Sequence, residues 1–283
     1  MSDAVVTGAS SGIGRGAVKV LVGHGWRVFA GVRKSADADS LRQEFGDKVE
    51  PLLFDVTEQG AVRAAAEQVR IRLNGQTLKG LVNNAGMGLG GPLMHQPVDQ
   101  IRRVFEVNAL GAVIVSQAFI PLLGADATLA GAPGRIVNIS SVAGKFGPPF
   151  MGDYAMSKHA VEAFSDVLRR ELMLYGIDVI VIGPGAVATP IWDKAETADY
   201  SAYAKTGYGE IVKKFLDWFI AEGRKGLPPE RIGQAVYTAL TAARPRVRYA
   251  VVPKRFANWT LPMTLPKRMV DRAIAKQLGL VRK

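Results

Sequence analysis

Short runs of β-branched and other apolar residues alternate with longer amphipathic stretches through roughly the first two thirds of the chain. The runs predict strands, and the stretches between them predict helices, because their apolar side chains recur every three or four positions. The predicted strands are Ala4–Thr7, Arg27–Val32, Val49–Phe54, Gly80–Val82, Arg135–Ile139 and Asp178–Ile182. The predicted helices are Ile13–His24, a stretch around Ala38–Phe45, Glu58–Leu73, Asp99–Leu123 and Tyr154–Tyr175. Repeated β-α-β units of this kind predict an α/β fold, a doubly wound parallel sheet of Rossmann type with helices on both faces.

The pattern changes in the last third of the chain. Residues 190–228 are rich in aromatic residues and glycine and match no sheet strand. Beyond them, Glu230–Ala243 predicts a helix and Tyr249–Val252 a last strand. Because no Pro/Ser-rich linker, repeat or low-complexity segment interrupts the sequence, we predict one domain. It spans residues 1–283 and has three parts, namely 1–189, 190–228 and 229–283.

The composition of the 283 residues is that of an ordinary globular protein, with 48% hydrophobic and 22% charged residues. The chain has no cysteine, which excludes disulfides, thiolate nucleophiles, cysteine zinc sites and iron–sulfur clusters. Its three histidines are far apart in the sequence, so we predict no metal site.

No targeting segment is evident. The first residues have neither the basic region nor the long apolar region of a secretory signal. The most apolar stretch, Ala109–Ala125, is interrupted by Ser116, Gln117 and Pro121 and is shorter than the ~20 residues that a membrane span needs. We therefore interpret it as a buried helix and expect a cytoplasmic protein.

The net charge of +11 is concentrated at the C-terminal end. From Arg244 to Lys283 the chain has eleven Lys or Arg and one acid, Asp271. The rest is nearly neutral, which argues against a nucleic-acid binder with an extended basic surface. Within this tail, apolar residues from Met269 to Val281 fall near helical spacing with basic residues on the other side. Two interpretations stay open: the apolar side covers the pocket or a subunit contact, or the segment makes weak contact with an anionic membrane surface.

A glycine-rich turn, Thr7-Gly8-Ala9-Ser10-Ser11-Gly12-Ile13-Gly14, joins the first predicted strand to the first predicted helix. Glycines let a backbone approach a pyrophosphate closely, and the helix N-terminus that follows offers free N–H groups and a positive dipole end. A position between a first strand and a first helix is the context that a dinucleotide-binding turn requires. We therefore favour a phosphate cradle over a turn that needs glycine for its shape alone.

Tyr154 and Lys158 are four residues apart in a predicted helix and so share one face. A free tyrosine has a pKa of ~10, too high for proton transfer at neutral pH. A neighbouring ammonium favours the phenolate and lowers that pKa. The pair is therefore a candidate general acid/base for interconverting an alcohol and a carbonyl, with a solvated Tyr and Lys on an amphipathic helix as the alternative.

These motifs and four others, in this order, resemble the short-chain dehydrogenase/reductase superfamily. The spacing of the threonine and glycines in the turn is similar to the family pattern T-G-x-x-x-G-x-G. The other matches are Asn83-Asn84-Ala85-Gly86, Asn108 with Gly111, Ile136-Val137-Asn138-Ile139-Ser140-Ser141, Tyr154-Ala155-Met156-Ser157-Lys158, and Pro184-Gly185 with Thr189. The resemblance covers about residues 4–190. The local sequences around Ser141 and over Val161–Leu172 resemble those of the retinol, hydroxysteroid and 3-hydroxybutyrate dehydrogenase branch.

The resemblance implies an NAD(P)-dependent oxidoreductase acting on CH–OH groups, in a homodimer or homotetramer. The catalytic residues it implies are Asn108, Ser141, Tyr154 and Lys158. Ser141 is preferred to Ser140 because it stands at the family's spacing before the tyrosine, and Ser140 is expected to face away on the alternating strand. Lys158 is also expected to hold the nicotinamide ribose, and Asn108 to support a proton relay through water. The cofactor-contacting positions it implies are Gly8, Ser10, Ser11, Gly12, Ile13, Gly14, Arg33, Lys34, Asp55, Val56, Asn84, Ala85, Gly86, Tyr154, Lys158, Pro184, Gly185, Val187 and Thr189.

The choice of nicotinamide depends on the end of the second predicted strand. An NAD site needs an acid there to accept a hydrogen bond from the ribose 2′-hydroxyl, and Val32 stands at that position. Arg33 and Lys34 follow and suit a 2′-phosphate, so we predict NADP(H) over NAD(H). Ser11 stands where many NADP-dependent relatives have a second basic residue, which keeps NAD(H) open.

Seven of the 22 aromatic residues fall within residues 190–220, the segment that covers the substrate in the resembling family. They are Trp192, Tyr200, Tyr203, Tyr208, Phe215, Trp218 and Phe219. Ligand pockets are mostly apolar, so this lid and the loop Phe146–Met151 predict a lipophilic alcohol or carbonyl, such as a retinoid, steroid or fatty alcohol. The alternatives are an NAD(H)-dependent dehydrogenase of a small hydroxy acid and a non-catalytic nucleotide-binding sensor.

Overall fold

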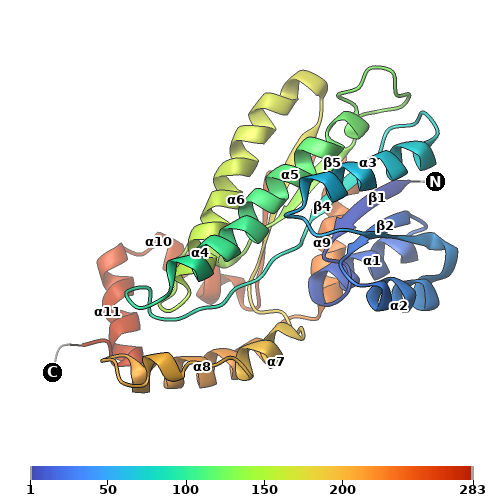
Figure 1. The fold of residues 1–283 in the computed structure, drawn as a ribbon. Helices are drawn as coiled ribbons and strands as arrows, with labels where there is room; N and C mark the ends of the chain where they lie inside the picture. The colour runs from blue at the N-terminus through green and yellow to red at the C-terminus, as the bar shows by residue number, and fades with distance from the viewer. Residues whose placement is uncertain (1, 282–283) are drawn as a thin grey trace.

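The computed structural model describes residues 2–281, and its centre is a parallel sheet of seven strands (Figure 1). The strands are β1 (Asp3–Thr7), β2 (Arg27–Val32), β3 (Val49–Leu53), β4 (Gly80–Asn83), β5 (Arg135–Ile139), β6 (Asp178–Pro184) and β7 (Arg248–Val251). Their order across the sheet is β3-β2-β1-β4-β5-β6-β7, and every neighbouring pair is parallel. The order reverses direction between β1 and β4, so the carboxyl ends of these two strands flank the crevice in which such sheets bind ligands. The predicted fold class is confirmed.

Helices cover both faces of the sheet (Figure 1). One face carries α1 (Gly12–Gly23), α2 (Ser35–Phe45) and α9 (Pro229–Thr241), and the other carries α3 (Gln59–Leu73), α5 (Gly111–Phe119) and α6 (Gly152–Glu171). Successive residues of β1 contribute to different cores: Ala4 and Val6 belong to the first and Val5 to the second. All three are fully buried, which explains the uninterrupted apolar run in the sequence.

The helix predicted at Asp99–Leu123 is confirmed, but it is not a regular α-helix throughout. The chain forms α4 (Val98–Phe105), a π-helical turn at Glu106–Leu110, α5, and a 3-10 turn at Pro121–Leu123. A π turn breaks the regular i to i−4 ladder, and side-chain contacts of Asn108 within it compensate for the irregular backbone. Pro121 has no N–H for the ladder, which ends α5. The other predicted elements are confirmed within a few residues. The last turn of the predicted helix Tyr154–Tyr175 is a 3-10 turn at Leu172–Tyr175.

Residues 190–228, the lid segment, contain no sheet strand. They form α7 (Ile191–Glu196), a 3-10 turn at Ser201–Tyr203 and α8 (Gly209–Arg224). A small apolar cluster of Phe150, Val212 and Phe215 joins this segment to the loop before α6. The three-part division of the chain stays a prediction.

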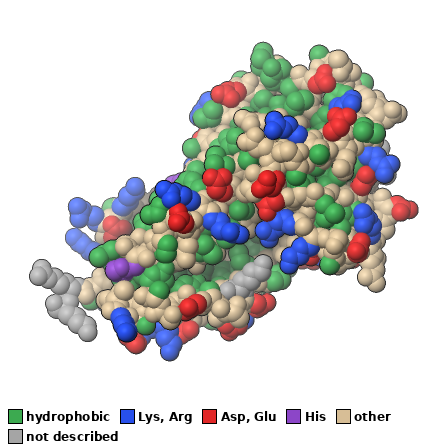
Figure 2. Space-filling model, viewed as in Figure 1, with side chains coloured by type: hydrophobic (Ala, Val, Ile, Leu, Met, Phe, Trp, Pro, Cys, Tyr) green, Lys and Arg blue, Asp and Glu red, His purple; other side chains and the backbone are tan. Residues whose placement is uncertain are grey.

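The C-terminal residues form a π turn at Phe256–Thr260, α10 (Leu261–Thr264) and α11 (Lys267–Leu278). Leu278 and Leu280 pack against the apolar cluster of the lid segment, at the end of the molecule where α8 and α11 lie together (Figure 1). Figure 2 shows basic side chains gathered at that same end, around α10 and α11. Within residues 2–281, no helix is both long enough and apolar enough to cross a bilayer.

Candidate active site

The glycine-rich turn lies at the carboxyl end of β1 and leads directly into α1. Gly8 and Gly12 have φ angles of +63° and +55°, a left-handed conformation that L side chains rarely adopt. A Cβ atom on Gly14 would collide with the carbonyl oxygen of Gly8, so the first turn of α1 presses against the loop itself. The N–H groups at the start of α1 therefore lie at a turn whose close packing requires glycine.

Hydrogen bonds join this turn to the end of β4. The Thr7 hydroxyl accepts the backbone N–H groups of Asn84 and Ala85, both at 3.0 Å. The Asn84 amide donates to the carbonyl oxygens of Thr7 at 2.9 Å and Gly8 at 3.2 Å. These contacts explain the Thr in front of the glycines and the Asn-Ala-Gly after β4, and they hold the two walls of the crevice together.

The segment after β6 lies against the same turn. A Cβ atom on Gly12 would stand 3.1 Å from the Thr189 methyl carbon, and the Val187 carbonyl accepts the Trp192 indole N–H at 2.7 Å. Gly185 donates its N–H to the Val251 carbonyl of β7 at 3.0 Å. The structure thus brings 184–189 beside residues 8–14.

At the end of β2, Val32 is buried and Arg33 and Lys34 are exposed. The Arg33 guanidinium stands 3.6 Å from an Asp55 carboxylate oxygen. Burial alone would raise the pKa of Asp55, but hydrogen bonds from Thr57 and the charge of Arg33 outweigh it and hold the pKa below its usual value. Asp55 is therefore charged at neutral pH, and Arg33 is held beside it with most of its side chain open to solvent.

The remaining predicted contact positions lie around the same crevice. Ser11 is exposed just before α1, and the Ser10 carbonyl accepts a hydrogen bond from Arg15 at 3.1 Å. Val56 is buried against α5, where a Cβ atom on Gly111 would approach its methyl carbon to 2.7 Å. Ile13 is half-buried in α1 and packs on the core of the first sheet face.

Tyr154 and Lys158 lie on α6 with Ser141 opposite, just after β5. The Lys158 ammonium donates to the Ile139 carbonyl at 2.8 Å and lies 5.7 Å from the centre of the Tyr154 ring. The Ser141 hydroxyl is hydrogen-bonded to the Tyr154 phenol and accepts the Ala143 N–H at 3.1 Å. Ser140 is oriented differently, because its hydroxyl lies beneath Gly144, where an added Cβ atom would stand 2.5 Å away.

Burial controls the ionisation of both groups. It raises the pKa of the Tyr154 phenol, which the hydrogen bond to Ser141 opposes. It lowers the pKa of Lys158 from 10.5 to about 8, which the nearby Glu162 carboxylate opposes. Lys158 is therefore mostly charged at neutral pH, and its charge favours the phenolate of its neighbour.

Asn108, in the π turn, bridges two other elements. Its amide nitrogen donates to the Met87 carbonyl at 2.8 Å and the Ser157 hydroxyl at 2.9 Å, and its amide oxygen accepts the Met87 N–H at 2.8 Å. A Cβ atom on Gly86 would stand 3.2 Å from the Asn108 amide oxygen and 3.5 Å from the Lys158 ammonium. A side chain at position 86 would therefore press on both buried polar groups.

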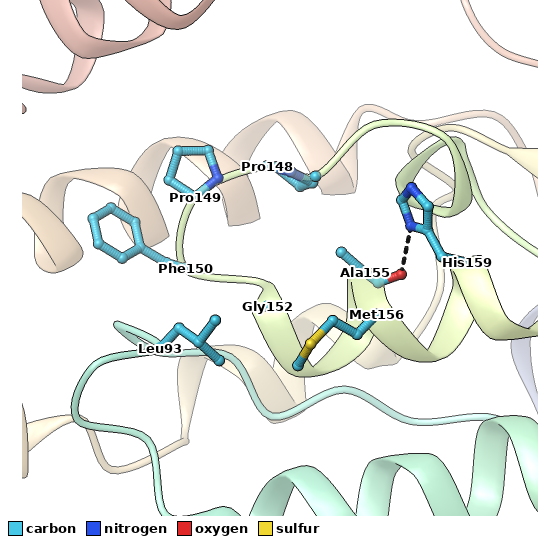
Figure 3. Close-up of a pocket in the computed structure, with 9 residues that line it drawn as sticks. Leu93, Pro148, Pro149, Phe150, Gly152, Ala155, Met156 and His159 are labelled. Atoms are coloured by element: carbon cyan, nitrogen blue, oxygen red, sulfur yellow. Dashed lines mark hydrogen bonds between the residues drawn. The ribbon is translucent and has the colours of Figure 1, made fainter.

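A cavity of about 530 Å³ lies beside α6, between its first two turns and two loops (Figure 3). Its lining residues are Leu93, Gly147, Pro148, Pro149, Phe150, Gly152, Ala155, Met156 and His159. The loop Phe146–Met151, predicted as an apolar wall, supplies much of this lining. The α6 positions that line it, Gly152, Ala155, Met156 and His159, lie on either side of the catalytic candidate Tyr154 in the sequence.

Sequence reasoning missed three charged residues near the site. The buried Asp153 carboxylate accepts the N–H groups of Leu89 at 3.0 Å and Gly90 at 3.2 Å. Glu162 is buried on α6 and paired with Arg248 of β7. The helical spacing of Glu162 from Lys158 was an available signal, but the partnership with Arg248 joins segments 86 residues apart. A local sequence pattern cannot predict an ion pair between residues so far apart in the chain.

The chain belongs to the short chain dehydrogenase family, whose family model matches residues 2–199. It is similar to the NADPH-dependent 3-dehydrocapnine reductase of Ornithobacterium rhinotracheale, with 40% identity over 279 residues and 98% of each chain covered. Retinol dehydrogenase 5 of Mus musculus is 34% identical over 290 residues, covering 96% of this chain and 88% of the relative. A solved short chain dehydrogenase/reductase of Burkholderia phymatum, in complex with NAD, has a TM-score of 0.77 at 26% identity, covering 96% of this chain and 95% of that one. The protein is an NAD(P)-dependent oxidoreductase that acts on CH–OH groups.

Proposed function

We propose that the protein is an NADP(H)-dependent oxidoreductase that interconverts a lipophilic alcohol with its ketone or aldehyde, and that Tyr154 is its general acid/base. The observation that carries this proposal is that Tyr154 lies beside Ser141, which is hydrogen-bonded to its phenol, and beside Lys158, whose ammonium is 5.7 Å from the centre of its ring. The buried Lys158 offers a charge beside a phenol whose own pKa is raised, and this is the arrangement that a proton-transferring tyrosine needs.

A bound nicotinamide supplies or accepts the hydride. In the reducing direction, the Ser141 hydroxyl donates a hydrogen bond to the substrate carbonyl oxygen, and Tyr154 gives that oxygen its proton. The Lys158 ammonium stabilises the phenolate that remains. Asn108 holds the Met87 loop, and we expect it to support the relay of the replacement proton through water. In the oxidising direction, the phenolate takes the hydroxyl proton back.

The cofactor-binding roles of the glycine turn, Asp55 and residues 184–189 are part of the same proposal. The preference for NADP(H) rests on the basic Arg33 and Lys34 at the end of β2, with no acid at the buried Val32. The name of the Ornithobacterium relative supports it, whereas the NAD in the Burkholderia structure is the contrary precedent.

The apolar lining of the cavity and the aromatic lid segment support a lipophilic substrate. Candidate carbonyls come from the relatives' names: 3-dehydrocapnine and the aldehyde of retinol. The test is a screen that follows NADPH absorbance with these compounds and with a small hydroxy acid, using Tyr154→Phe as the inactive control. Faster turnover of a small hydroxy acid with NADH would favour the alternative dehydrogenase. Tight NADPH binding with no turnover of any compound would favour a sensor.

A homodimer or homotetramer is the quaternary state we propose. Apolar side chains lie exposed on α6 and on the π turn before α5, with Leu110 47% exposed and Val167 51%. Contact with a second copy would remove them from water. Light scattering at micromolar concentration tests this, and a mass equal to one chain would contradict it.

Peripheral membrane contact is proposed for residues 254–276. Leu278 and Leu280 pack inward, but Phe256 is 72% exposed and Met269 is 54% exposed amid basic side chains. Each Lys or Arg near an anionic surface could add ~1 kcal/mol. We expect salt-sensitive co-sedimentation with anionic vesicles and none with neutral ones. Equal binding to both lipids, or none at low salt, would contradict the proposal.

A further inference from the structure

A buried ion pair lies directly behind the proposed catalytic cluster. Glu162 stands one helical turn after Lys158 on α6, and both side chains are buried. The Arg248 guanidinium, from β7, approaches the Glu162 carboxylate with its Nε at 3.1 Å from each oxygen and its Nη2 at 3.0 Å from Oε1. The Lys145 ammonium stands 3.3 Å from Oε2. One carboxylate thus binds two cations directly.

Arg248 also reaches the backbone at the catalytic serine. Its Nη2 donates to the Ser141 carbonyl oxygen at 3.2 Å. The guanidinium is covered by the Trp259 ring, whose centre is 4.5 Å away, and it lies close enough to β6 that a Cβ atom on Gly183 would collide with it. Arg248 is therefore confined between β6 and Trp259, and its orientation is defined.

The Glu162 side chain also supports the turn that follows Ser141. A Cβ atom on Gly144 would stand 3.0 Å from the Glu162 Cγ and 3.0 Å from the Lys158 carbonyl oxygen. The turn at Val142–Gly144 therefore rests on α6 at the position of Glu162. The ion pair joins three parts of the site: α6, the turn after β5 and strand β7.

We propose that Glu162 and Arg248 are positioning residues for this site: the buried Glu162 carboxylate, one helical turn from Lys158, orients Arg248 and balances the Lys158 charge, and Arg248 fixes the Ser141 backbone. The proposal rests on the proposed function for the roles of Lys158 and Ser141. The proposal gives the buried Glu162 carboxylate a role. Removing one of its ion-pair partners would leave a buried charge uncompensated.

The charged groups around Lys158 and Glu162 determine whether each substitution raises or lowers the pKa of Lys158. Burial lowers the pKa of Lys158 to about 8, and the Glu162 charge opposes that shift. The other titratable or charged neighbours are Tyr154 on α6, Lys145 after the turn and Arg248 on β7. Removing the negative charge must lower the pKa of Lys158, and removing either cation must leave it unchanged or raise it.

The test is an NMR titration of the protein with carbon-13-labelled lysine side chains, with the Lys158 signal assigned by its loss in Lys158→Arg. No substrate or cofactor is needed. In Glu162→Gln we expect the Lys158 pKa to fall by about two pH units, from the roughly 6 Å spacing of i, i+4 side chains and an effective dielectric constant of about 20. The matched control is Glu171→Gln, which removes the same charge from an exposed position about 13 Å further along α6.

A second variant keeps the test decisive if Glu162→Gln does not fold. The Lys145 side chain is 39% exposed, so Lys145→Gln should fold normally, and we expect it to leave the Lys158 pKa unchanged or raise it slightly. Glu162→Asp, which keeps the charge, should titrate closer to wild type than Glu162→Gln does. An unchanged Lys158 pKa in Glu162→Gln would overturn the proposal. So would a fall of similar size in Lys145→Gln, because opposite charges cannot both lower it electrostatically.

The kinetic readout concerns Ser141. Arg248→Lys keeps the charge but cannot bridge Glu162 and the Ser141 carbonyl together. We expect kcat to fall about tenfold with the cofactor KM unchanged, whereas the exposed Arg246→Lys should match wild type. Equal kcat in both variants would contradict the role of Arg248. If no substrate is turned over, the proposed function fails, but the titration still decides the role of Glu162.

Discussion

Replacing Asn108 with alanine removes a buried bridge between the π turn, the Met87 loop and α6. The side chain is 2% exposed and makes three hydrogen bonds, two with the Met87 backbone and one with Ser157. At about 1 kcal/mol each, their loss should lower the free energy of unfolding by about 3 kcal/mol. With an unfolding entropy of roughly 2.1 cal/mol/K per residue, a chain of this length should melt about 5 °C lower.

Differential scanning calorimetry measures this change in Tm. The control is Asn258→Ala, because Asn258 is exposed and makes one hydrogen bond, to the Pro253 carbonyl at 2.9 Å. Surface substitutions change stability by only about 0.5 kcal/mol, so its Tm should move by about 1 °C. Equal Tm values for the two variants would refute the reasoning that the Asn108 bridge stabilises the irregular turn. A normal Tm with lost turnover would leave Asn108 a purely catalytic residue.

Two further predictions concern the cofactor and pH. In Arg33→Ala, the Kd for NADPH should rise roughly 10- to 100-fold, as expected for a lost charged hydrogen bond, with little change for NADH. Fluorescence titration measures both, with Arg42→Ala of α2 as control, and tighter NADH binding by wild type would contradict the NADP(H) preference. The fold lowers the pKa of Lys158 from 10.5 to about 8. Between pH 8 and 10.5, Lys158 is therefore protonated in the unfolded chain but not in the folded one. Its contribution to the free energy of unfolding rises with pH across that window. Lys158→Met should remove that rise and increase Tm at pH 7 while abolishing turnover; a lower Tm at pH 7 would contradict the sign.

Local patterns were enough to predict the sheet, the glycine turn and the shared face of Tyr154 and Lys158, whereas the other site positions came from the family resemblance. The apolar runs had to be strands covered on both faces, and the glycines between β1 and α1 are required by left-handed backbone and by the close contact of Gly14 with Gly8. Tyr154 and Lys158 share a face because α6 is regular there. In each case the structure is determined by interactions between residues close together in the sequence.

What the sequence did not predict depends on contacts between distant segments. The π turn at Glu106–Leu110 has an ordinary helical composition, and its geometry is matched by the bonds of Asn108 to the Met87 loop. The ion pair of Glu162 with Arg248 depends on β7 lying beside β6. For the basic tail, the sequence left both packing against the protein and membrane contact open. In the structure, Leu278 and Leu280 pack inward, while Phe256 lies exposed.

The central claim is that the Tyr154 hydroxyl transfers the proton, and Tyr154→Phe tests it most directly. The variant keeps the ring that packs against Gly88, whose added Cβ would stand 3.1 Å from the tyrosine ring. We predict that kcat falls by about 10²- to 10⁴-fold, the usual contribution of general acid–base catalysis, while Tm and the NADPH Kd stay close to wild type. The exposed Tyr175→Phe, just beyond α6, should have normal kcat. A Tyr154→Phe enzyme with kcat within tenfold of wild type, on the same substrate, would contradict the account.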